Sequence, residues 1–397
     1  MTCQRSMFLI LGVLLAAEGV GADVEIRSQT QFGNARNQVI IDHAGGMPAL
    51  CRAGNGDLLF AHAEMWEPVP SNGGIRLLRS ADEGCTWSKP QVIVRPKSAE
   101  WTATTWSGLH LMPDGSLILA YNQSWAPKRS TASIEEVDPA KIWDIMSPRR
   151  KFEAYIIRSA DHGNTWSEPH RICADRNIWL FGRPLTLGDG TVIAPAVPFN
   201  EQDVSFAAFV RTGDNGRSWG SLETIADGPE GFNEATLGLA KNGNIIAILR
   251  DIASGPRRQF RQTVSMDNGK TWTKPSLIEL WGKMPDLLTL PDGRLVLAVG
   301  SVDCMDGDLA FSAPPNSSYA GLFVSSDHGR TWQRDLMLGS PDPRYTIPYD
   351  APVMAALRNG NLLAISFAAD RRHQRDPLFG WSRGMHYVLH ELRPTEK

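Results

Sequence analysis

The chain has 397 residues, of which 42% are hydrophobic, and its formal net charge is −3. This slightly acidic balance provides no basic field, which argues against a nucleic acid partner. After the N-terminal segment, no stretch is long and apolar enough to span a bilayer, which argues against a membrane-spanning protein.

The first 22 residues are typical of a secretory signal peptide. Arg5 precedes an apolar run at 7–17, and small residues follow as far as Ala22. We therefore expect residues 1–22 to be removed and the mature chain, 23–397, to be secreted or periplasmic. Four cysteines remain without a pairing pattern, and the histidines show no metal-ligand spacing, so no metal or cofactor is predicted.

One eight-residue signature, S/T-x-D-x-G-x-T/S-W, occurs five times. Its Asp residues are Asp82, Asp161, Asp214, Asp267 and Asp327, separated by 79, 53, 53 and 60 residues. The Asp carboxylate can accept backbone N–H bonds within a tight turn, and the Gly can supply a positive φ. Because every copy offers the same local bonds, we interpret the five signatures as structural turns rather than substrate contacts.

A second repeated element is an Asn-Gly or Asp-Gly pair between two apolar runs, a strong signal for a β-hairpin. Six such pairs occur, beginning at Asn55, Asp114, Asp189, Asn242, Asp292 and Asn359. Each predicted unit then has strand A, the Gly turn, strand B, a loop, strand C, the Asp signature and strand D. A period near 50 residues indicates a propeller.

We therefore predict an all-β, six-bladed β-propeller of four-stranded antiparallel sheets, forming a single domain over 23–397. The sixth blade has strands A and B at 352–368 and a C strand at 385–393, but it has no signature. Residues 23–29 are the candidate for its outer strand, which would close the ring and remove exposed strand edges.

The antiparallel order gives this propeller two different ends. The turn end carries the A–B turns and the Asp signatures, whereas the mouth end carries the starts of A, the ends of B and the B–C loops. Insertions fall at the mouth end, at 124–151 in blade 2 and 302–318 in blade 5. We therefore expect function at the mouth end.

Carboxylates, arginines and aromatic residues gather at the predicted mouth end. This mixture suits a carbohydrate with an acidic group, because Arg binds carboxylates bidentately and aromatic faces stack on sugar rings. Carboxylates also supply the acid, base or nucleophile of glycoside cleavage. Candidate substrate-binding residues are His62, Trp106, Arg183, Asp286 and Asp350.

The five Asp turns and the six-blade count resemble those of the sialidase superfamily, also called BNR-repeat proteins, over nearly the whole mature chain. The resemblance implies three arginines that bind a sialic acid carboxylate, an Asp acid/base, and a Tyr nucleophile activated by a Glu. Blade 4 matches best: Glu234 lies eight residues before Asn242, and Arg250 lies eight after it. These residues correspond to the activating Glu and to one arginine of the family.

Other positions depart from the family pattern. Gly46 occupies the place of the blade 1 arginine, and Ser317 or Ser318 that of the blade 5 arginine. The blade 1 loop contains no Asp, and Glu64 and Glu67 are the carboxylates that could substitute for it. Tyr349 lies near the expected nucleophile, two residues before the matching position.

Three functions remain open. The leading hypothesis is an exo-acting glycoside hydrolase on a terminal, acidic sugar, with Glu234, Tyr349 and Glu64 as catalytic residues and Arg250 in substrate binding. The departures above favour a glycan-binding propeller without catalysis, because each lost charge-assisted bond costs roughly 1.5–3 kcal/mol. The third is a polysaccharide lyase that uses a Tyr or His base. In each case the partner is a glycan, and the sequence predicts no oligomeric state.

Overall fold

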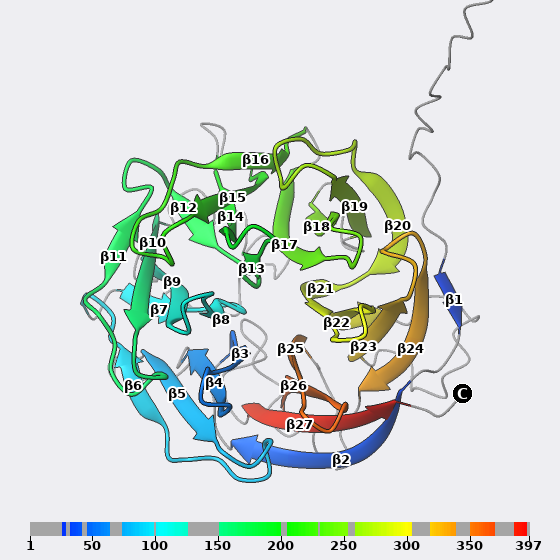
Figure 1. Ribbon diagram of the computed structural model, residues 1–397, viewed down its shortest axis with the longest axis horizontal. Coiled ribbons are helices and arrows are strands. Elements are labelled where there is room, and N and C mark those ends of the chain that lie inside the picture. Colours follow the sequence, from blue (N-terminus) through cyan, green and yellow to red (C-terminus); the bar gives the residue numbers. More distant parts are fainter. Residues whose placement is uncertain are drawn as a thin grey trace, which may run out of the picture.

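The computed structural model describes residues 26–28, 32–41, 46–63, 74–98, 101–125, 151–199, 205–228, 231–252, 259–303, 318–338, 350–369 and 385–394. These residues form six antiparallel sheets around a common axis, as Figure 1 shows. They contain no helix, and therefore none that could span a membrane. The predicted six-bladed, all-β architecture is confirmed.

Each blade runs from an inner to an outer strand. Blade 1 contains β3 (Ala49–Arg52), β4 (Leu58–Ala63), β5 (Ile75–Ser80) and β6 (Gln91–Val94). Blade 2 contains β7 (Trp101–Thr104), β8 (Leu109–Leu111), β9 (Leu117–Trp125), β10 (Lys151–Ser159) and β11 (His170–Ile172). Blade 3 contains β12 (Ile178–Leu180), β13 (Leu185–Thr186), β14 (Val192–Pro198), β15 (Ala207–Thr212) and β16 (Glu223–Ala226).

The second half of the ring follows the same order. Blade 4 contains β17 (Phe232–Leu239), β18 (Ile245–Asp251), β19 (Gln259–Ser265) and β20 (Ser276–Trp281). Blade 5 contains β21 (Lys283–Thr289), β22 (Leu295–Asp303), β23 (Ser318–Ser325) and β24 (Trp332–Leu338). Blade 6 contains β25 (Asp350–Ala356), β26 (Leu362–Ala369) and β27 (Met385–Pro394).

The N-terminal part of the chain closes the ring, but not with the predicted segment. β2 (Phe32–Ile41) pairs antiparallel with β27 and forms the outer strand of blade 6. The segment predicted for this place contains β1 (Ile26–Ser28), which pairs parallel with β24 at the edge of blade 5. β2 and β27 come from opposite ends of the sequence and lie side by side in Figure 1. β2 and β27 have ten residues each and pair from Phe32 opposite Pro394 to Ile41 opposite Tyr387.

The five Asp signatures form one hydrogen-bonded turn, as predicted. In the first copy, Asp82 accepts bonds from the Ser80 hydroxyl (2.8 Å), the Thr86 amide (2.8 Å) and the Thr86 hydroxyl (2.6 Å). The Gly84 amide donates to the Ser80 hydroxyl oxygen at 2.8 Å. The other four copies repeat these bonds. The Gly has a positive φ in every copy, and so does the residue before it.

The Asp turns also bind neighbouring blades together. Arg79, just before the first signature, donates to the carbonyl of His162 in the second turn (2.8 Å). Arg211, in the same position of blade 3, donates to the carbonyl of Asn268 in blade 4 (2.9 Å). Each pair crosses from a C strand to the next Asp turn. The turn end is therefore held by bonds that repeat with the blades.

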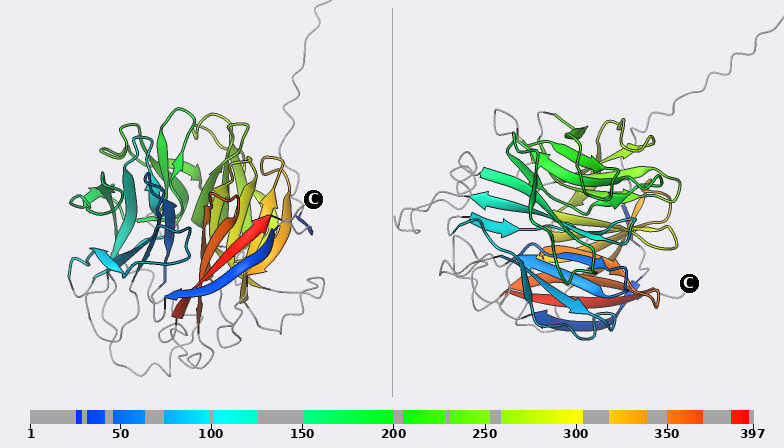
Figure 2. Two further views of the ribbon diagram at one scale, coloured as in Figure 1. Left: turned by 60° about the horizontal axis from the view of Figure 1, so that its bottom comes forward. Right: turned by 60° about the vertical axis from the view of Figure 1, so that its left-hand side comes forward.

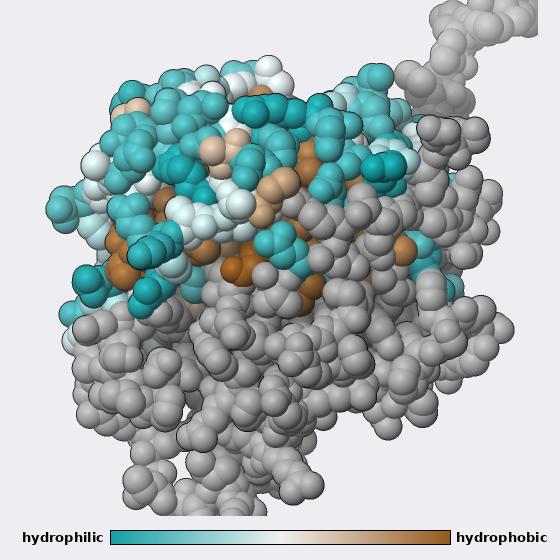
Figure 3. Space-filling view, turned by 90° about the horizontal axis from the view of Figure 1, so that it is seen from below, coloured by the Kyte–Doolittle hydropathy of each residue, from teal (hydrophilic) through white to brown (hydrophobic). Residues whose placement is uncertain are grey.

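Hydrophobic side chains fill the spaces between blades. In six clusters, alternate residues of each sheet pack against the sheet beside it. In the side view of Figure 3, the described surface, which belongs mainly to the turn-bearing half, is largely hydrophilic. Figure 2 shows the strands running between the two ends of the ring. Of the predicted insertions, residues 126–150 in blade 2 and 304–317 in blade 5 lie outside the described residues.

Candidate functional site

Glu234 and Arg250 meet at the mouth end of blade 4. Glu234 lies near the start of β17 and Arg250 near the end of β18, so the antiparallel hairpin brings them together. The Arg250 Nη1 and Glu234 Oε1 atoms are 2.6 Å apart. The two residues are only 7% and 3% exposed, so the ion pair is largely shielded from water. Shielding strengthens the electrostatic attraction within the pair.

Two further groups orient this pair. Asn233 lies opposite Arg250 in the strand register, and its side-chain oxygen accepts a 2.8 Å bond from Arg250 Nε. The other carboxylate oxygen of Glu234 accepts a 2.8 Å bond from the Met284 amide at the start of the next blade. Neither group is among the residues predicted from the sequence. The hairpin register set by the Asn242-Gly243 turn could have identified Asn233, whereas the Met284 amide contact is tertiary.

The backbone bends at Glu234 in a way that other blades share. The regular pairing of β17 with β18 is interrupted between Asn233 and Thr236, and Glu234 has φ 47°. Met47 (φ 63°) and Met284 (φ 56°) also lie eight residues before their Gly turns. A bulge re-aims the side chain that it carries. The blade architecture therefore creates the bend, and only blade 4 places a carboxylate there among these three.

Arg183 and Asp286 form a second buried ion pair near the propeller axis. Arg183 Nη2 and Asp286 Oδ2 are 2.6 Å apart, and Nε lies 3.1 Å from Oδ1, so the contact is bidentate. Arg183 also donates to the carbonyls of Met354 (2.7 Å) and Leu50 (3.3 Å). The Met354 amide donates to Asp286 at 2.9 Å. One guanidinium thus connects the inner strands of blades 1, 3, 5 and 6.

The buried Arg183 charge affects its neighbours. Burial opposes this charge, but the Asp286 carboxylate outweighs burial and raises the pKa of Arg183. Burial, together with the nearby Arg183 charge, lowers the pKa of His110 to about 3. Burial raises the pKa of the Cys51 thiol to about 11. His110 and Cys51 are therefore neutral at pH 7, and Asp286 compensates the charge of Arg183.

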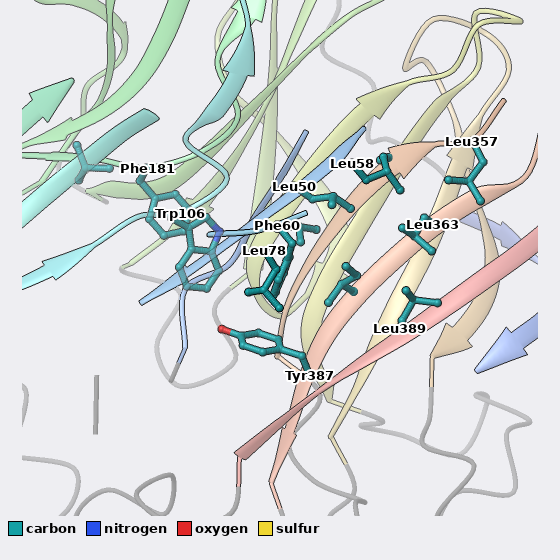
Figure 4. Packing of buried hydrophobic residues seen from close by; sticks show 14 residues of the cluster. Leu50, Leu58, Phe60, Leu78, Trp106, Phe181, Leu357, Leu363, Tyr387 and Leu389 are labelled. Atoms are coloured by element: carbon teal, nitrogen blue, oxygen red, sulfur yellow. The ribbon is translucent and has the colours of Figure 1, made fainter. Parts of the chain in front are cut away.

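Trp106 and His62 lie in the hydrophobic core rather than on an open surface. Trp106 is 1% exposed and stacks on Phe181 with ring centroids 4.8 Å apart. His62 is 3% exposed, and its ring centroid lies 5.5 Å from that of Tyr387. Figure 4 shows Trp106 and Tyr387 facing the same cluster around Phe60. Burial lowers the pKa of His62 to about 4, so its ring is neutral at pH 7.

The remaining predicted residues are placed only in part. Asp350 begins β25 and pairs with Phe367 on β26. Tyr349 and Glu64 lie outside the described residues. At the position of the expected blade 1 arginine, the carbonyl of Gly46 accepts a bond from the Ala63 amide (3.2 Å). Within the described part of the chain, no cluster of His, Cys, Asp and Glu could hold a metal ion.

Six antiparallel sheets in a closed ring, five of them with the same Asp turn, define a sialidase-like β-propeller. The chain belongs to the BNR repeat-like domain family, whose model matches residues 72–362. It therefore falls within the sialidase and BNR superfamily, as its resemblance predicted.

Known proteins of this superfamily match most of the chain at low identity. A sialidase of Bacteroides fragilis (strain YCH46) is 23% identical over 334 residues. The match covers 76% of this chain and 58% of that protein, so the chain spans less than two thirds of the relative's length.

Solved structures share the fold. A protein of unknown function from Dyadobacter fermentans DSM 18053 superposes with a TM-score of 0.68 at 18% identity, covering 92% of this chain and all of its own. The Trypanosoma rangeli sialidase has a TM-score of 0.61 at 12% identity, covering 93% of this chain and 58% of that one. A leech intramolecular trans-sialidase, solved with 2,7-anhydro-Neu5Ac, has a TM-score of 0.59 at 11% identity, covering 91% and 70% of the two chains.

Proposed function

We propose that this chain is a secreted or periplasmic exo-acting glycoside hydrolase that removes a terminal, acidic sugar. The observation that carries the proposal is the ion pair between Glu234 and Arg250 at the mouth of blade 4, with atoms 2.6 Å apart. The family relationship supports it, because the matched relative from Bacteroides fragilis is named a sialidase.

In the proposed reaction, Glu234 is the general base. An ionised carboxylate accepts a proton from a nearby hydroxyl, and Tyr349 is the proposed nucleophile that it activates. A phenol is suited to an anionic substrate, since a carboxylate nucleophile would repel the acidic group. Glu64 is the proposed acid that protonates the departing glycosidic oxygen.

Arg250 is the proposed ligand of the sugar's acidic group. Glu234 and Asn233 hold its guanidinium in place before substrate arrives, which reduces the entropy lost on binding. Arg183 and Asp286, bonded to each other and to the inner strands of blades 1 and 6, would form the floor beneath the substrate. Asp350 is proposed to lie at the mouth beside them, and the buried His62 and Trp106 are proposed to support the mouth from the core beneath it.

The test is a turnover screen with fluorogenic glycosides of sialic acid, glucuronic acid and galacturonic acid between pH 4 and pH 8. We expect hydrolysis of at least one acidic glycoside. Glu234→Gln should lower kcat by about 10²-fold or more, the usual contribution of a general base. Glu279→Gln, a substitution at an exposed position of β20 in the same blade, is the matched control and should leave kcat unchanged.

A second function, glycan binding without catalysis, is favoured by one specific observation. At the blade 1 position where the family has an arginine, Gly46 contributes only its backbone carbonyl, which is bonded to Ala63. Glycan binding that survives Glu234→Gln, with no turnover at any pH, would establish this function in place of hydrolysis. An unsaturated product absorbing in the ultraviolet would instead identify a lyase.

A further inference from the structure

Blade 2 has longer strands at the mouth end than blade 1 beside it. β9 and β10 have nine residues each, whereas β4 and β5 have six each. β7 extends the sheet further by pairing with the last four residues of β9. In the right-hand view of Figure 2, the cyan strands of this blade reach farther toward the loop side than the strands below them. Trp125 and Lys151 belong to the predicted insertion at 124–151, but both lie in strands.

One face of this extension carries two tryptophans in neighbouring strands. Trp101 lies opposite Trp125, and Trp125 lies opposite Lys151, so the three side chains share a face. Both tryptophans are partly exposed, unlike the buried Trp106 of the core. We call the face defined by Trp101, Trp125, Lys97 and Lys151 the blade 2 platform.

Lysines lie against both indole rings of the platform. Lys97 Nζ is 3.9 Å from the Trp101 ring centroid, and Lys151 Nζ is 5.5 Å from that of Trp125. A cation in this position is attracted by the ring face. The contact therefore holds each ammonium group beside a flat apolar surface.

The platform has an excess of positive charge. Lys97 pairs with Glu153, which also accepts a 2.7 Å bond from the Tyr155 hydroxyl. Arg171 approaches the same carboxylate at 3.5 Å. Among the described residues of this face, Lys97 and Arg171 lie against one carboxylate, Glu153, and Lys151 adds a third cation beside Trp125. The unbalanced charge would attract an anion.

We propose that the blade 2 platform binds acidic sugar units of a polysaccharide, separately from the Glu234–Arg250 site. An indole ring offers a flat surface for the apolar face of a sugar ring. The adjacent ammonium groups complement a carboxylate or sulfate on that sugar. A flat aromatic surface with excess positive charge matches this one class of ligand better than a neutral glycan or an apolar peptide.

Affinity electrophoresis tests the proposal with four acidic polysaccharides: polygalacturonate, hyaluronate, heparan sulfate and polysialic acid. Neutral dextran is the reference. We expect at least one acidic polysaccharide, but not dextran, to retard the protein. The double substitution Trp101→Ala and Trp125→Ala should weaken that binding about tenfold or more, as for loss of central aromatic contacts.

Lys151→Gln changes an exposed residue and should weaken binding and reduce its dependence on salt. Lys270→Gln, an equally exposed lysine at the turn end, is the matched control and should have no effect. Retardation by dextran alone, no binding of any acidic polysaccharide, or equal effects of Lys151→Gln and Lys270→Gln would each overturn the proposal.

Two measurements separate the platform from the site of the proposed hydrolysis. The tryptophan double variant should keep its melting temperature within a few degrees and its turnover of small fluorogenic glycosides. Glu234→Gln should keep its binding of the acidic polysaccharide. Loss of polysaccharide binding in Glu234→Gln, with none in the tryptophan variant, would assign the binding to the mouth of blade 4 and refute the platform.

Discussion

The two ends of this propeller are stabilised in different ways. At the turn end, the same Asp turn occurs in five blades, and its bonds are local, as between Asp82 and Thr86. At the mouth end, the polar contacts occur once each, as between Glu234 and Arg250 in blade 4. Repeated contacts share the stabilisation among blades, whereas a single contact has no substitute elsewhere. The comparison indicates that substitutions at the axis and mouth have larger effects than those in any one turn.

The axial pair should give the largest effect on stability. Arg183→Met leaves the fully buried Asp286 carboxylate without its cation, which is expected to cost about 3–5 kcal/mol of unfolding free energy. Chemical denaturation measures this loss. Arg294→Met removes an exposed ion pair with Asp292 at the turn end and should cost less than about 1 kcal/mol. Equal losses in the two variants would contradict the comparison.

A single Asp turn should give an intermediate effect. Asp327→Ala removes the acceptor of bonds from Ser325 and Thr331 and is expected to cost about 1–3 kcal/mol, since bonds to a charged group are involved. Asp227→Ala, at an exposed position outside the turns, is the control and should be nearly neutral. A larger loss of unfolding free energy for Asp327→Ala than for Arg183→Met would contradict the expectation that axial substitutions are the more destabilising.

Acid should produce a graded loss of stability. Burial lowers the pKa of His62 and His390 to about 4, below the ordinary value of 6.5. Between these values the unfolded chain binds more protons than the folded one, so stability rises with pH and is lost as pH falls from 6.5 toward 4. Melting temperatures measured from pH 7 to pH 4.5 should therefore decrease.

The Asp turns lose their stabilisation at lower pH than the buried histidines do, so the two contributions to stability can be measured separately. Hydrogen bonds from Thr86 and Ser218 lower the pKa of Asp82 and Asp214 to about 2, from an ordinary 3.8. Their stabilisation is present above pH 3.8 and is lost only as pH falls toward 2. His62→Phe should therefore make the melting temperature depend less steeply on pH between pH 4 and pH 6.5. An unchanged slope would show that His62 does not contribute.

The sequence predicted the fold in detail because the fold is built from local signals. The Asn242-Gly243 turn and the Asp267 turn each determine a hairpin within a few residues, and they recur around the ring. Closure was predicted incorrectly, since β2 and β27 pair over more than 340 residues of sequence and no local pattern distinguishes β2 from β1. The spacing of residues around a local turn does not reveal which distant strand pairs with β27.

The candidate site was predictable only where it lies within one hairpin. Glu234 and Arg250 belong to β17 and β18, so their spacing around one turn was enough to bring them together. Arg183 and Asp286 come from blades 3 and 5, and the sequence placed both at the mouth without indicating that they bind each other. Such a pair depends on the closed ring, which no single blade encodes.

Hydrogen exchange of the protein with and without its best-binding acidic glycan reports which end of the ring contacts the ligand. We expect protection at the mouth end, in peptides that contain Glu234 and Arg250, and none in peptides that cover the Asp267 turn. Protection concentrated in the Asp turns, with the start of β17 and the end of β18 unchanged, would contradict this expectation.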